Sequence, residues 1–319
     1  MNHISFKFIP YIHRLIVQTL QWHHFLTETA ATMAGPWEKE IPKLALSCDY
    51  LAHGMMSIAA LHLAYLNPGE RDKYEYLSAQ HQDLALGPFR QSMLNVTSEN
   101  CTQLFAFAGL LIIVQFAPSH GTEAIFPFLA ANLYKGPANW IVCHRACESI
   151  IREASPYIKS GPLRDLLAQG SRLANCAKEL ITLPENEDDK SLLYISQRVL
   201  TFLPIKASTT VDEMQAYTEA ISWLRRLLAA SSSVSDSLRC RIFTAIWPAQ
   251  VSDTFIRMLQ EERQPALIIT AHYCLLLQRC HSCWYMEHRA YDLLMAVQQS
   301  LAVEWTPYIE RVVKVVQNP

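Results

Sequence analysis

The sequence lacks an excess of charge of either sign. Its 319 residues include 27 basic and 29 acidic side chains, which leaves a formal net charge of -2 at neutral pH. A protein that binds duplex DNA directly needs a basic face to displace the counterions of the phosphate backbone. The composition therefore argues against direct recognition of nucleic acid, and we expect none.

The sequence also lacks closely spaced cysteine pairs among basic residues. A zinc-dependent DNA-binding module requires such pairs. The nine cysteines occupy positions 48, 101, 143, 147, 176, 240, 274, 280 and 283. Their number is odd, their spacing is irregular, and no charged and then apolar signal opens the chain. These features favour a reducing, cytoplasmic or nuclear location over secretion.

Glycine is scarce, with nine residues, and runs that alternate between apolar and polar side chains are few. Half of the residues are hydrophobic, and many of them recur at helical spacing. The sequence therefore predicts an all-α fold. The longest apolar run, Leu104 to Ala117, has about 14 residues and is too short to cross a bilayer. We expect a core helix there and no membrane span.

Motifs that hold cofactors are absent as well. The sequence has no glycine-rich phosphate loop, no dinucleotide-binding fingerprint, no serine elbow and no paired catalytic carboxylates. We therefore expect no cofactor. Any chemistry here would use no nucleotide.

Two kinds of segment could in principle bind metal. Cys143 to Cys147 and Cys280 to Cys283 each place thiol and imidazole groups within one turn, as zinc ligands can be. The acidic run Glu185 to Asp189 could hold a metal and a diphosphate. We interpret the cysteine segments as parts of ordinary helices and the acidic run as a solvated surface loop, and we predict no metal site.

Five blocks of sequence resemble one known family, and they follow one another along the chain in the family's order. The most informative is WPAQVSDTFIRMLQEERQPALIITAHYCLLLQRCHSCWYM, at Trp247 to Met286. The others are His23 to Ala30, Leu44 to Pro68, His81 to Ala117 and Trp305 to Val313. Together they resemble the effector domain of fungal binuclear-zinc-cluster transcription factors of the sterol-uptake-control type. The six-cysteine DNA-reading module of that family does not occur in this sequence.

The resemblance implies one domain over residues 1–319, a single orthogonal helical bundle around a central apolar cavity. Residues 266–277 are apolar on nearly every face and must be surrounded by other helices. We expect them beside residues 104–117 at the centre of the bundle. In the family, such a cavity holds a sterol-like molecule.

Histidine, methionine and aromatic residues on the central helices could line that cavity or simply fill the core. As ligand-binding candidates we take His53, Met55, Met56, His62, Phe105, Phe107, Trp284 and Tyr285. As candidate catalytic residues we take His272 and Tyr273, because polar groups in the middle of an apolar helix require a partner.

Three functions compete. The leading hypothesis is a stand-alone, metal- and nucleotide-independent cyclase of the cycloaddition type, acting in fungal secondary metabolism on a terpenoid-, sterol- or polyketide-like substrate, since preorganisation can suffice for such a reaction. The first alternative is a ligand-responsive regulator that acts through a DNA-binding partner. The second is a truncated zinc-cluster activator. A hydrophobic small molecule is the expected partner in each, and homodimerisation is left open.

Overall fold

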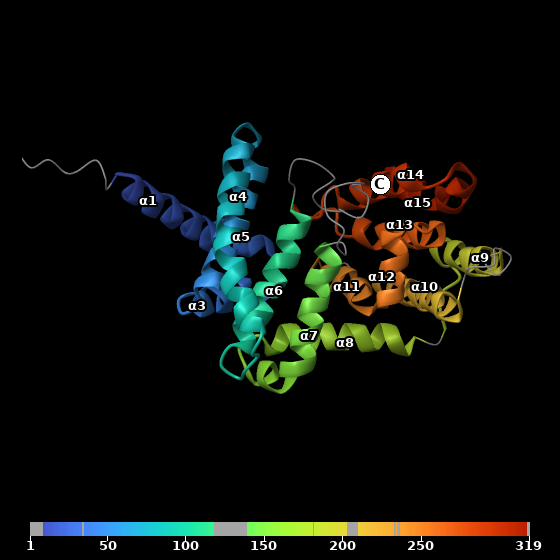
Figure 1. Cartoon of the computed structure of the whole chain (residues 1–319), viewed down its shortest axis with the longest axis horizontal. Helices are drawn as coiled ribbons and strands as arrows, with labels where there is room; N and C mark the ends of the chain where they lie inside the picture. Colours follow the sequence, from blue (N-terminus) through green and yellow to red (C-terminus); the bar gives the residue numbers. More distant parts are fainter. Residues whose placement is uncertain are drawn as a thin grey trace, which may run out of the picture. The chain divides into compact units, whose positions relative to one another are not determined.

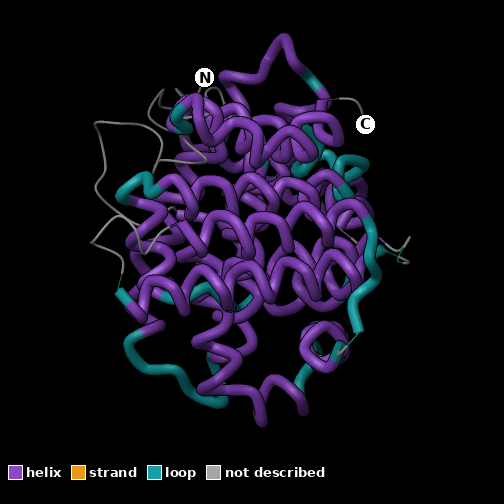
Figure 2. The backbone as a smooth tube through the Cα atoms, turned by 90° about the vertical axis from the view of Figure 1, so that its right-hand side faces the viewer, coloured by secondary structure: helices purple, strands orange, loops and turns teal. Residues whose placement is uncertain are grey.

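Every regular element that the structure describes is a helix (Figure 2), so the all-α prediction is confirmed. The structure is a computed structural model that describes residues 9–33, 35–117, 139–180, 182–202, 210–232, 234 and 237–317. The chain divides into two compact units. The first comprises Met1–Val114 and Ile150–Leu166, and the second comprises Gln115–Ser149 and Leu167–Pro319. The prediction of one domain with a central cavity stays a prediction.

The first unit is built mainly from the long helices of the N-terminal third (Figure 1). Its elements are α1 (Ile9–His24), a π-helical turn (Phe25–Thr29), α2 (Ala30–Met33), a 3-10 turn (Gly35–Trp37), α3 (Glu40–Ala45), α4 (Asp49–Leu66), a 3-10 turn (Pro68–Glu70), α5 (Arg71–Met93) and most of α6 (Cys101–Phe116). The second half of α7 (Asn139–Ser160) also belongs to it.

Helices α4 and α5 form an antiparallel pair, and two polar contacts fix its register. His53 Nδ1 lies 2.9 Å from His81 Nδ1, and Ser57 Oγ lies 2.8 Å from Ser78 Oγ. Asn67 ends α4 in a non-helical conformation just before Pro68, which disfavours helical backbone in the residue that precedes it. The chain can therefore turn back at once, so that a buried stretch of α4 lies against α5.

Aromatic packing completes the core of the first unit. The Phe107 ring of α6 lies 5.4 Å from the ring of Tyr50 and 4.7 Å from that of Phe89, measured between centroids. The absence of a side chain at Gly54 admits this ring, since an added Cβ there would stand 2.8 Å from Phe107 Cε2. Sequence spacing alone did not indicate this close approach.

The second unit surrounds one fully buried helix. Its elements are most of α8 (Arg164–Glu179), α9 (Glu187–Phe202), α10 (Val211–Ser231), α11 (Ser237–Gln250), α12 (Asp253–Gln260), α13 (Gln264–Gln278), α14 (Arg289–Ser300), a 3-10 stretch (Val303–Ile309) and α15 (Glu310–Gln317). Every residue from Pro265 to Leu277 is buried. Helices α9 to α12, α14 and α15 all contact α13, as expected for a helix that is apolar on all faces.

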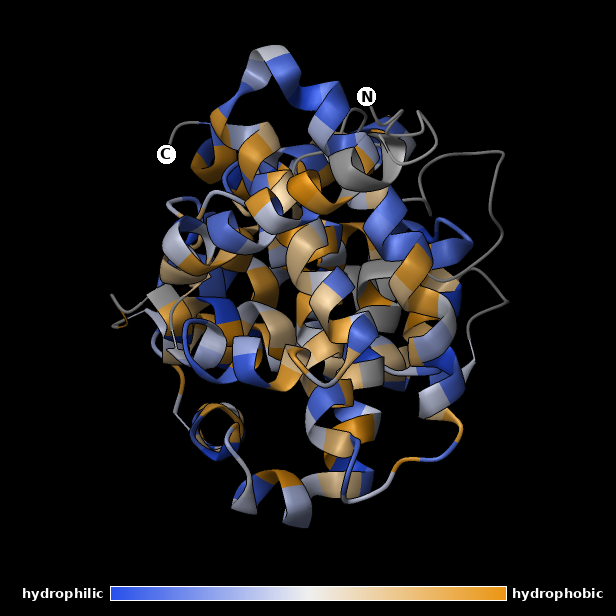
Figure 3. Cartoon of the chain, turned by 90° about the vertical axis from the view of Figure 1, so that its left-hand side faces the viewer, coloured by the Kyte–Doolittle hydropathy of each residue, from blue (hydrophilic) through white to orange (hydrophobic). Residues whose placement is uncertain are grey.

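The helices around α13 are amphipathic. In α12, for example, Phe255, Ile256 and Leu259 are buried whereas Asp253 and Arg257 are exposed. Figure 3 shows that hydrophobic and hydrophilic residues also alternate along the helices on the side opposite to that of Figure 2, which faces the viewer there. Among the helices of the described ranges, none is long and apolar enough to cross a membrane.

The interpretation of the acidic run as a solvated loop was wrong. Helix α9 begins at Glu187, and its first turn carries Asp188 and Asp189. Asp189 is buried and accepts two hydrogen bonds from Arg225, at 2.7 and 3.0 Å, while Asp188 accepts from Arg311 at 3.1 Å. Carboxylates are favourable at a helix N-terminus, but their arginine partners are distant in sequence. Only the tertiary fold brings them together.

The cysteine segment between α13 and α14 is also not helical. Cys280 to His288 forms a succession of turns, and α14 begins only at Arg289. In the part of the chain that the structure describes, no three histidine, cysteine, aspartate or glutamate side chains gather in a way that could hold a metal ion. The Cys143 side chain lies outside the described residues.

Candidate functional site

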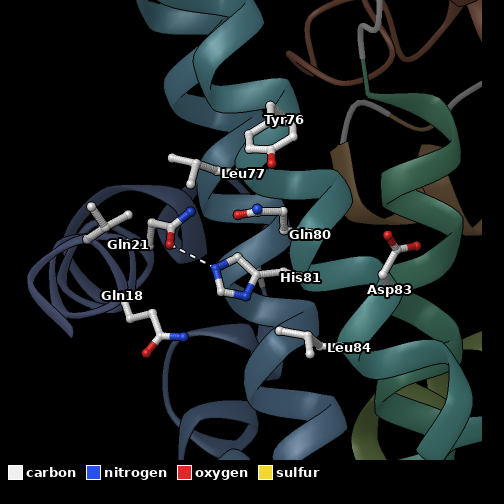
Figure 4. A pocket seen from close by; sticks show the side chains of 9 residues that line it. Gln18, Gln21, Tyr76, Leu77, Gln80, His81, Asp83 and Leu84 are labelled. Carbon is white, nitrogen blue, oxygen red and sulfur yellow. Dashed lines mark hydrogen bonds between the residues drawn. The ribbon is translucent and has the colours of Figure 1, made fainter. Parts of the chain in front are cut away.

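A groove of about 580 Å³ lies in the first unit, between α1 and α5 (Figure 4). Its volume falls within the range of small-molecule sites, which is roughly 300–1,000 Å³. The lining residues come from two short helical stripes: Val17, Gln18 and Gln21 of α1, and Tyr76, Leu77, Gln80, His81, Asp83 and Leu84 of α5.

Helical periodicity gathers these residues on facing sides. Residues three and four apart lie on the same face of a helix. Tyr76, Gln80 and Leu84 therefore form one row, and Leu77 and His81 form the row beside it. The resulting wall alternates apolar and polar groups. Such a wall suits a guest that is mostly apolar but carries a polar atom.

A chain of hydrogen bonds runs from α4 through α5 to the groove. His53 Nδ1 lies 2.9 Å from His81 Nδ1, and His81 Nε2 lies 2.9 Å from Gln21 Oε1. The amide oxygen of Gln21 can only accept, so His81 Nε2 carries the proton. In neutral His81 the Nδ1 atom then accepts from His53 Nδ1–H. This assignment follows from the hydrogen-bond network.

The series of hydrogen bonds is incomplete where it reaches the groove. Gln21 is 2% exposed, and its Nε2 atom has no hydrogen-bond partner in the part of the chain that the structure describes. Leaving such a donor buried and unpaired costs about 1–3 kcal/mol. Figure 4 shows the Gln21 oxygen turned to His81 and its nitrogen turned away from it. Gln21 is itself one of the residues that line the groove.

Of the residues predicted from sequence in the first unit, His53 is connected to this groove through His81. Met55 and Met56 are buried core residues of α4. His62 lies 3.0 Å from Thr29 Oγ1 through its Nδ1 atom. Burial, and secondarily the neighbouring His24, lowers the pKa of His62 to about 4, so its imidazole is neutral at pH 7.

The two phenylalanines of α6 differ. Phe107 is buried against Tyr50 and Phe89, whereas Phe105 is half-buried. Neither lines the groove. Their role as ligand contacts stays a prediction, and for Phe107 the observed contacts are those of a core residue.

In the second unit, His272 and Tyr273 are fully buried, and their polar atoms are hydrogen-bonded to other residues of the protein. His272 Nδ1 donates to the Ile268 carbonyl at 2.9 Å, and its Nε2 lies 2.9 Å from Ser191 Oγ. Burial lowers the pKa of His272 to about 4. The Tyr273 hydroxyl donates to the Thr244 carbonyl at 2.8 Å.

The aromatic neighbours of Tyr273 belong to the same core. Its ring stacks on Trp247 with centroids 4.8 Å apart, and burial raises its pKa well above the ordinary value. Both α13 candidates therefore have the partners that a buried polar side chain requires. Those partners come from the protein itself.

Trp284 and Tyr285 lie in the turns after α13, and both are buried. The Tyr285 hydroxyl accepts from Arg241 Nη1 at 2.7 Å, and burial raises the pKa of that tyrosine. The ring centroids of Trp284 and Tyr285 are 5.4 Å apart. These two residues and the α13 pair belong to the second unit, whereas the other six candidates belong to the first.

A second, smaller pocket of about 300 Å³ lies in the second unit. Leu180, Leu183, Glu185, Asp189, Leu193, Ser222, Arg225 and Arg226 line it. Its wall contains the paired Asp189 and Arg225, whose charges already satisfy each other. The pocket is too small and too strongly charged to suit a bulky apolar guest.

Sequence reasoning missed Gln21 and the α5 stripe. One signal was present: glutamines at positions 18 and 21 interrupt the apolar pattern of α1, and polar residues at 80 and 81 alternate with leucines at 77 and 84. A mixed stripe of this kind also occurs on solvated helix faces. Only the crossing of α1 and α5 distinguishes the two cases.

Comparison with known proteins finds similarity to fungal transcription factors. The family model described as a fungal specific transcription factor domain matches residues 17–173, which include all of the groove. A Zn(2)-C6 fungal-type transcription factor of Aspergillus fumigatus is 24% identical over 275 residues, covering 79% of this chain and 65% of the relative.

Two further relatives are also fungal proteins with related names. Sterol uptake control protein 2 of Saccharomyces cerevisiae is 23% identical over 265 residues, covering 81% of this chain and 27% of the relative. A Zn(2)-C6 fungal-type transcription factor of Gibberella zeae is 24% identical over 302 residues, covering 83% and 54%. The chain thus spans from about a quarter to two thirds of the length of these curated relatives.

These findings overturn the leading hypothesis. The stand-alone cyclase of secondary metabolism is wrong, because the matching domain and the relatives are those of transcription factors. The comparisons do not test the assignment of His272 and Tyr273 as catalytic residues, which stays a prediction. Residues 17–173 match the model of the fungal specific transcription factor domain, and the chain is similar to fungal Zn(2)-C6 transcription factors.

Proposed function

We propose that this chain is the ligand-responsive part of a fungal transcription regulator and binds an apolar small molecule in the groove between α1 and α5. One observation carries the proposal: a groove of about 580 Å³ lies wholly within the matched domain. Its leucines and Val17 offer apolar contact area, and its glutamines and His81 offer polar contacts.

The relatives support a sterol as the class of ligand. Two of them, from Saccharomyces cerevisiae and Candida albicans, carry the name sterol uptake control protein 2. A sterol has a rigid apolar frame with one hydroxyl group, which matches the mixed wall of the groove. Groove binding by a rigid guest also costs little conformational entropy.

Contact with DNA would then be made by a different part of the regulator. With 27 basic and 29 acidic residues, the chain offers little net attraction for a polyanion. We propose that it acts through a DNA-binding partner, whether a separate protein or a segment joined to it. Such a regulator would work in the nucleus or shuttle to it from the cytoplasm.

Thermal denaturation with and without sterols tests the proposal. A ligand that binds only the native state adds about 2.7 kcal/mol of stability at a hundredfold excess over its Kd. We expect ergosterol or cholesterol, delivered from cyclodextrin, to raise the Tm by a few degrees. Empty cyclodextrin is the reference.

A pair of arginine variants locates the binding. Leu84→Arg introduces a long cation at the groove, whereas Leu94→Arg makes the same change at a residue that is 78% exposed and outside the groove. The first should abolish the sterol-induced shift and the second should retain it. Absence of a shift in the parent protein, or equal shifts in both variants, would contradict the proposal.

A further inference from the structure

We infer that the amide N–H of Gln21 selects the occupant of the α1–α5 groove, and that this occupant is an apolar molecule bearing an oxygen acceptor. The inference rests on the proposed function, because it concerns the same groove. It goes further in naming the residue that discriminates between ligands and the atom that it recognises.

The first step is the unsatisfied donor. Gln21 is 2% exposed, and its Nε2 atom finds no partner among the described residues. Buried polar groups are nearly always hydrogen-bonded in native proteins, by protein, water or ligand. Gln21 belongs to the groove wall, so a molecule seated in the groove is placed to complete this bond.

The second step is the fixed orientation of the amide. Gln21 Oε1 accepts from His81 Nε2 at 2.9 Å, and His81 Nδ1 lies 2.9 Å from His53 Nδ1. In this arrangement the NH₂ group of Gln21 faces away from His81 (Figure 4). The bond to His81 therefore occupies the amide oxygen and leaves the NH₂ group to donate to another acceptor.

The third step is the chemistry of selection. A ketone, ether or hydroxyl oxygen accepts a hydrogen bond from an amide N–H, whereas a hydrocarbon of the same shape leaves the donor buried and unpaired. Sites built to hydrogen-bond one group discriminate strongly against analogues that lack it. Val17, Leu77 and Leu84 contribute apolar surface for the rest of the molecule.

Binding of three matched steroids to the full chain tests the inference. Cholestanol, cholestanone and cholestane share one saturated frame and differ only in carrying a hydroxyl, a ketone or no oxygen. We expect the alcohol and the ketone to bind about tenfold more tightly than the hydrocarbon, which corresponds to one recovered hydrogen bond. The ketone is decisive, since it can only accept.

Variants of Gln21 assign the effect to its donor. Gln21→Met keeps the length of the side chain and removes the donor, and Gln21→Glu keeps the acceptor for His81 and removes the donor. Both should abolish the preference for the ketone over the hydrocarbon. Gln91→Met makes the same change at an exposed residue of α5 outside the groove and should leave the preference intact. If Gln21→Met fails to fold, Gln21→Glu still gives the answer.

The outcomes separate the two proposals. Equal binding of all three steroids, or a ketone that binds like the hydrocarbon, overturns the role of Gln21 while sterol binding stands. A preference for oxygen that survives in Gln21→Glu overturns it too. Failure of every steroid to bind overturns both this inference and the proposed function.

Discussion

Helices α13 and α4 are both buried and mostly apolar, yet their polar side chains serve different ends. In α13, His272 and Tyr273 are bound within the second unit, to Ser191 and to the carbonyl groups of Ile268 and Thr244. In α4, His53 begins a chain of hydrogen bonds that passes through His81 and finishes at a groove.

The difference shows what distinguishes a candidate site from a satisfied core. A polar group in an apolar helix always needs a partner, so its presence alone carries little information. What matters is whether the hydrogen bonds close within the protein or end at a surface that a ligand can reach. By this criterion the first unit contains the better site.

Removal of the Trp247 side chain should have the largest effect on stability, because it disrupts the core in which the polar groups of α13 are satisfied. Trp247 is fully buried, stacks on Tyr273 and donates to the Ala220 carbonyl at 3.0 Å. Trp247→Ala should lower the free energy of unfolding by about 3–5 kcal/mol. Urea unfolding followed by circular dichroism measures it. The half-buried Trp305→Ala is the control, and equal losses in the two variants would show that Trp247 is not a core residue.

Acid should lower the free energy of unfolding, because each unit contains a buried neutral imidazole that is protonated on unfolding. The pKa values of His272 and His62 are lowered to about 4 by burial, whereas an unfolded histidine titrates near 6.5. Between these values the unfolded chain binds more protons, so stability is full above about pH 6.5 and is lost as the pH falls towards 4. The loss is about 3 kcal/mol for His272 and smaller for His62, whose charge solvent screens in part.

Urea unfolding between pH 7.5 and 4.5 measures this loss. His272→Gln should remove one part of the pH dependence, and His62→Gln should remove another. The exposed His281→Gln serves as the control. A slope that is unchanged in both buried variants would rule out these histidines as its source.

Two helical glycines contrast a tight site with an open one. A Cβ at Gly54 would lie 2.8 and 2.9 Å from two Phe107 carbons, while a Cβ at Gly170 would meet nothing within 4 Å. Gly54→Ala should therefore destabilise by about 1–3 kcal/mol through overpacking. Gly170→Ala, inside α8, should stabilise by about 0.5–1 kcal/mol. The reverse order in thermal denaturation would contradict the packing of Phe107.

The smallest expected change tests the comparison most directly. Tyr273→Phe removes one hydroxyl and leaves the Thr244 carbonyl without its donor, which should cost about 1–2 kcal/mol of stability. Sterol affinity, measured by fluorescence titration, should equal that of the parent protein. A tenfold loss of affinity without loss of stability would move the ligand site to α13.

Much of the fold could be predicted from the sequence because helical periodicity is local. The apolar run at 266–277 predicted a surrounded helix, and the structure places six helices around it. The acidic run at 185–189 failed as a prediction because its partners Arg225 and Arg311 lie far along the chain.

The site was predicted less well, for the same physical reason. His53 was chosen for its type and its place on a central helix, and it does belong to the chain of hydrogen bonds that leads to the groove. Gln21 was missed because an amide near the end of an amphipathic helix is common on protein surfaces. Its importance depends on His81, which is 60 residues away.

The sequence by itself determined the helical class, the burial of α13 and the kinship with fungal transcription factors, since composition, periodicity and ordered sequence blocks are properties of the chain alone. Only the tertiary structure decided which polar groups are satisfied. The hydrogen bonds of His272 close within the second unit, whereas the donor of Gln21, a groove residue, has no partner among the described residues. That distinction arises from contacts between residues remote in sequence, which no local pattern encodes.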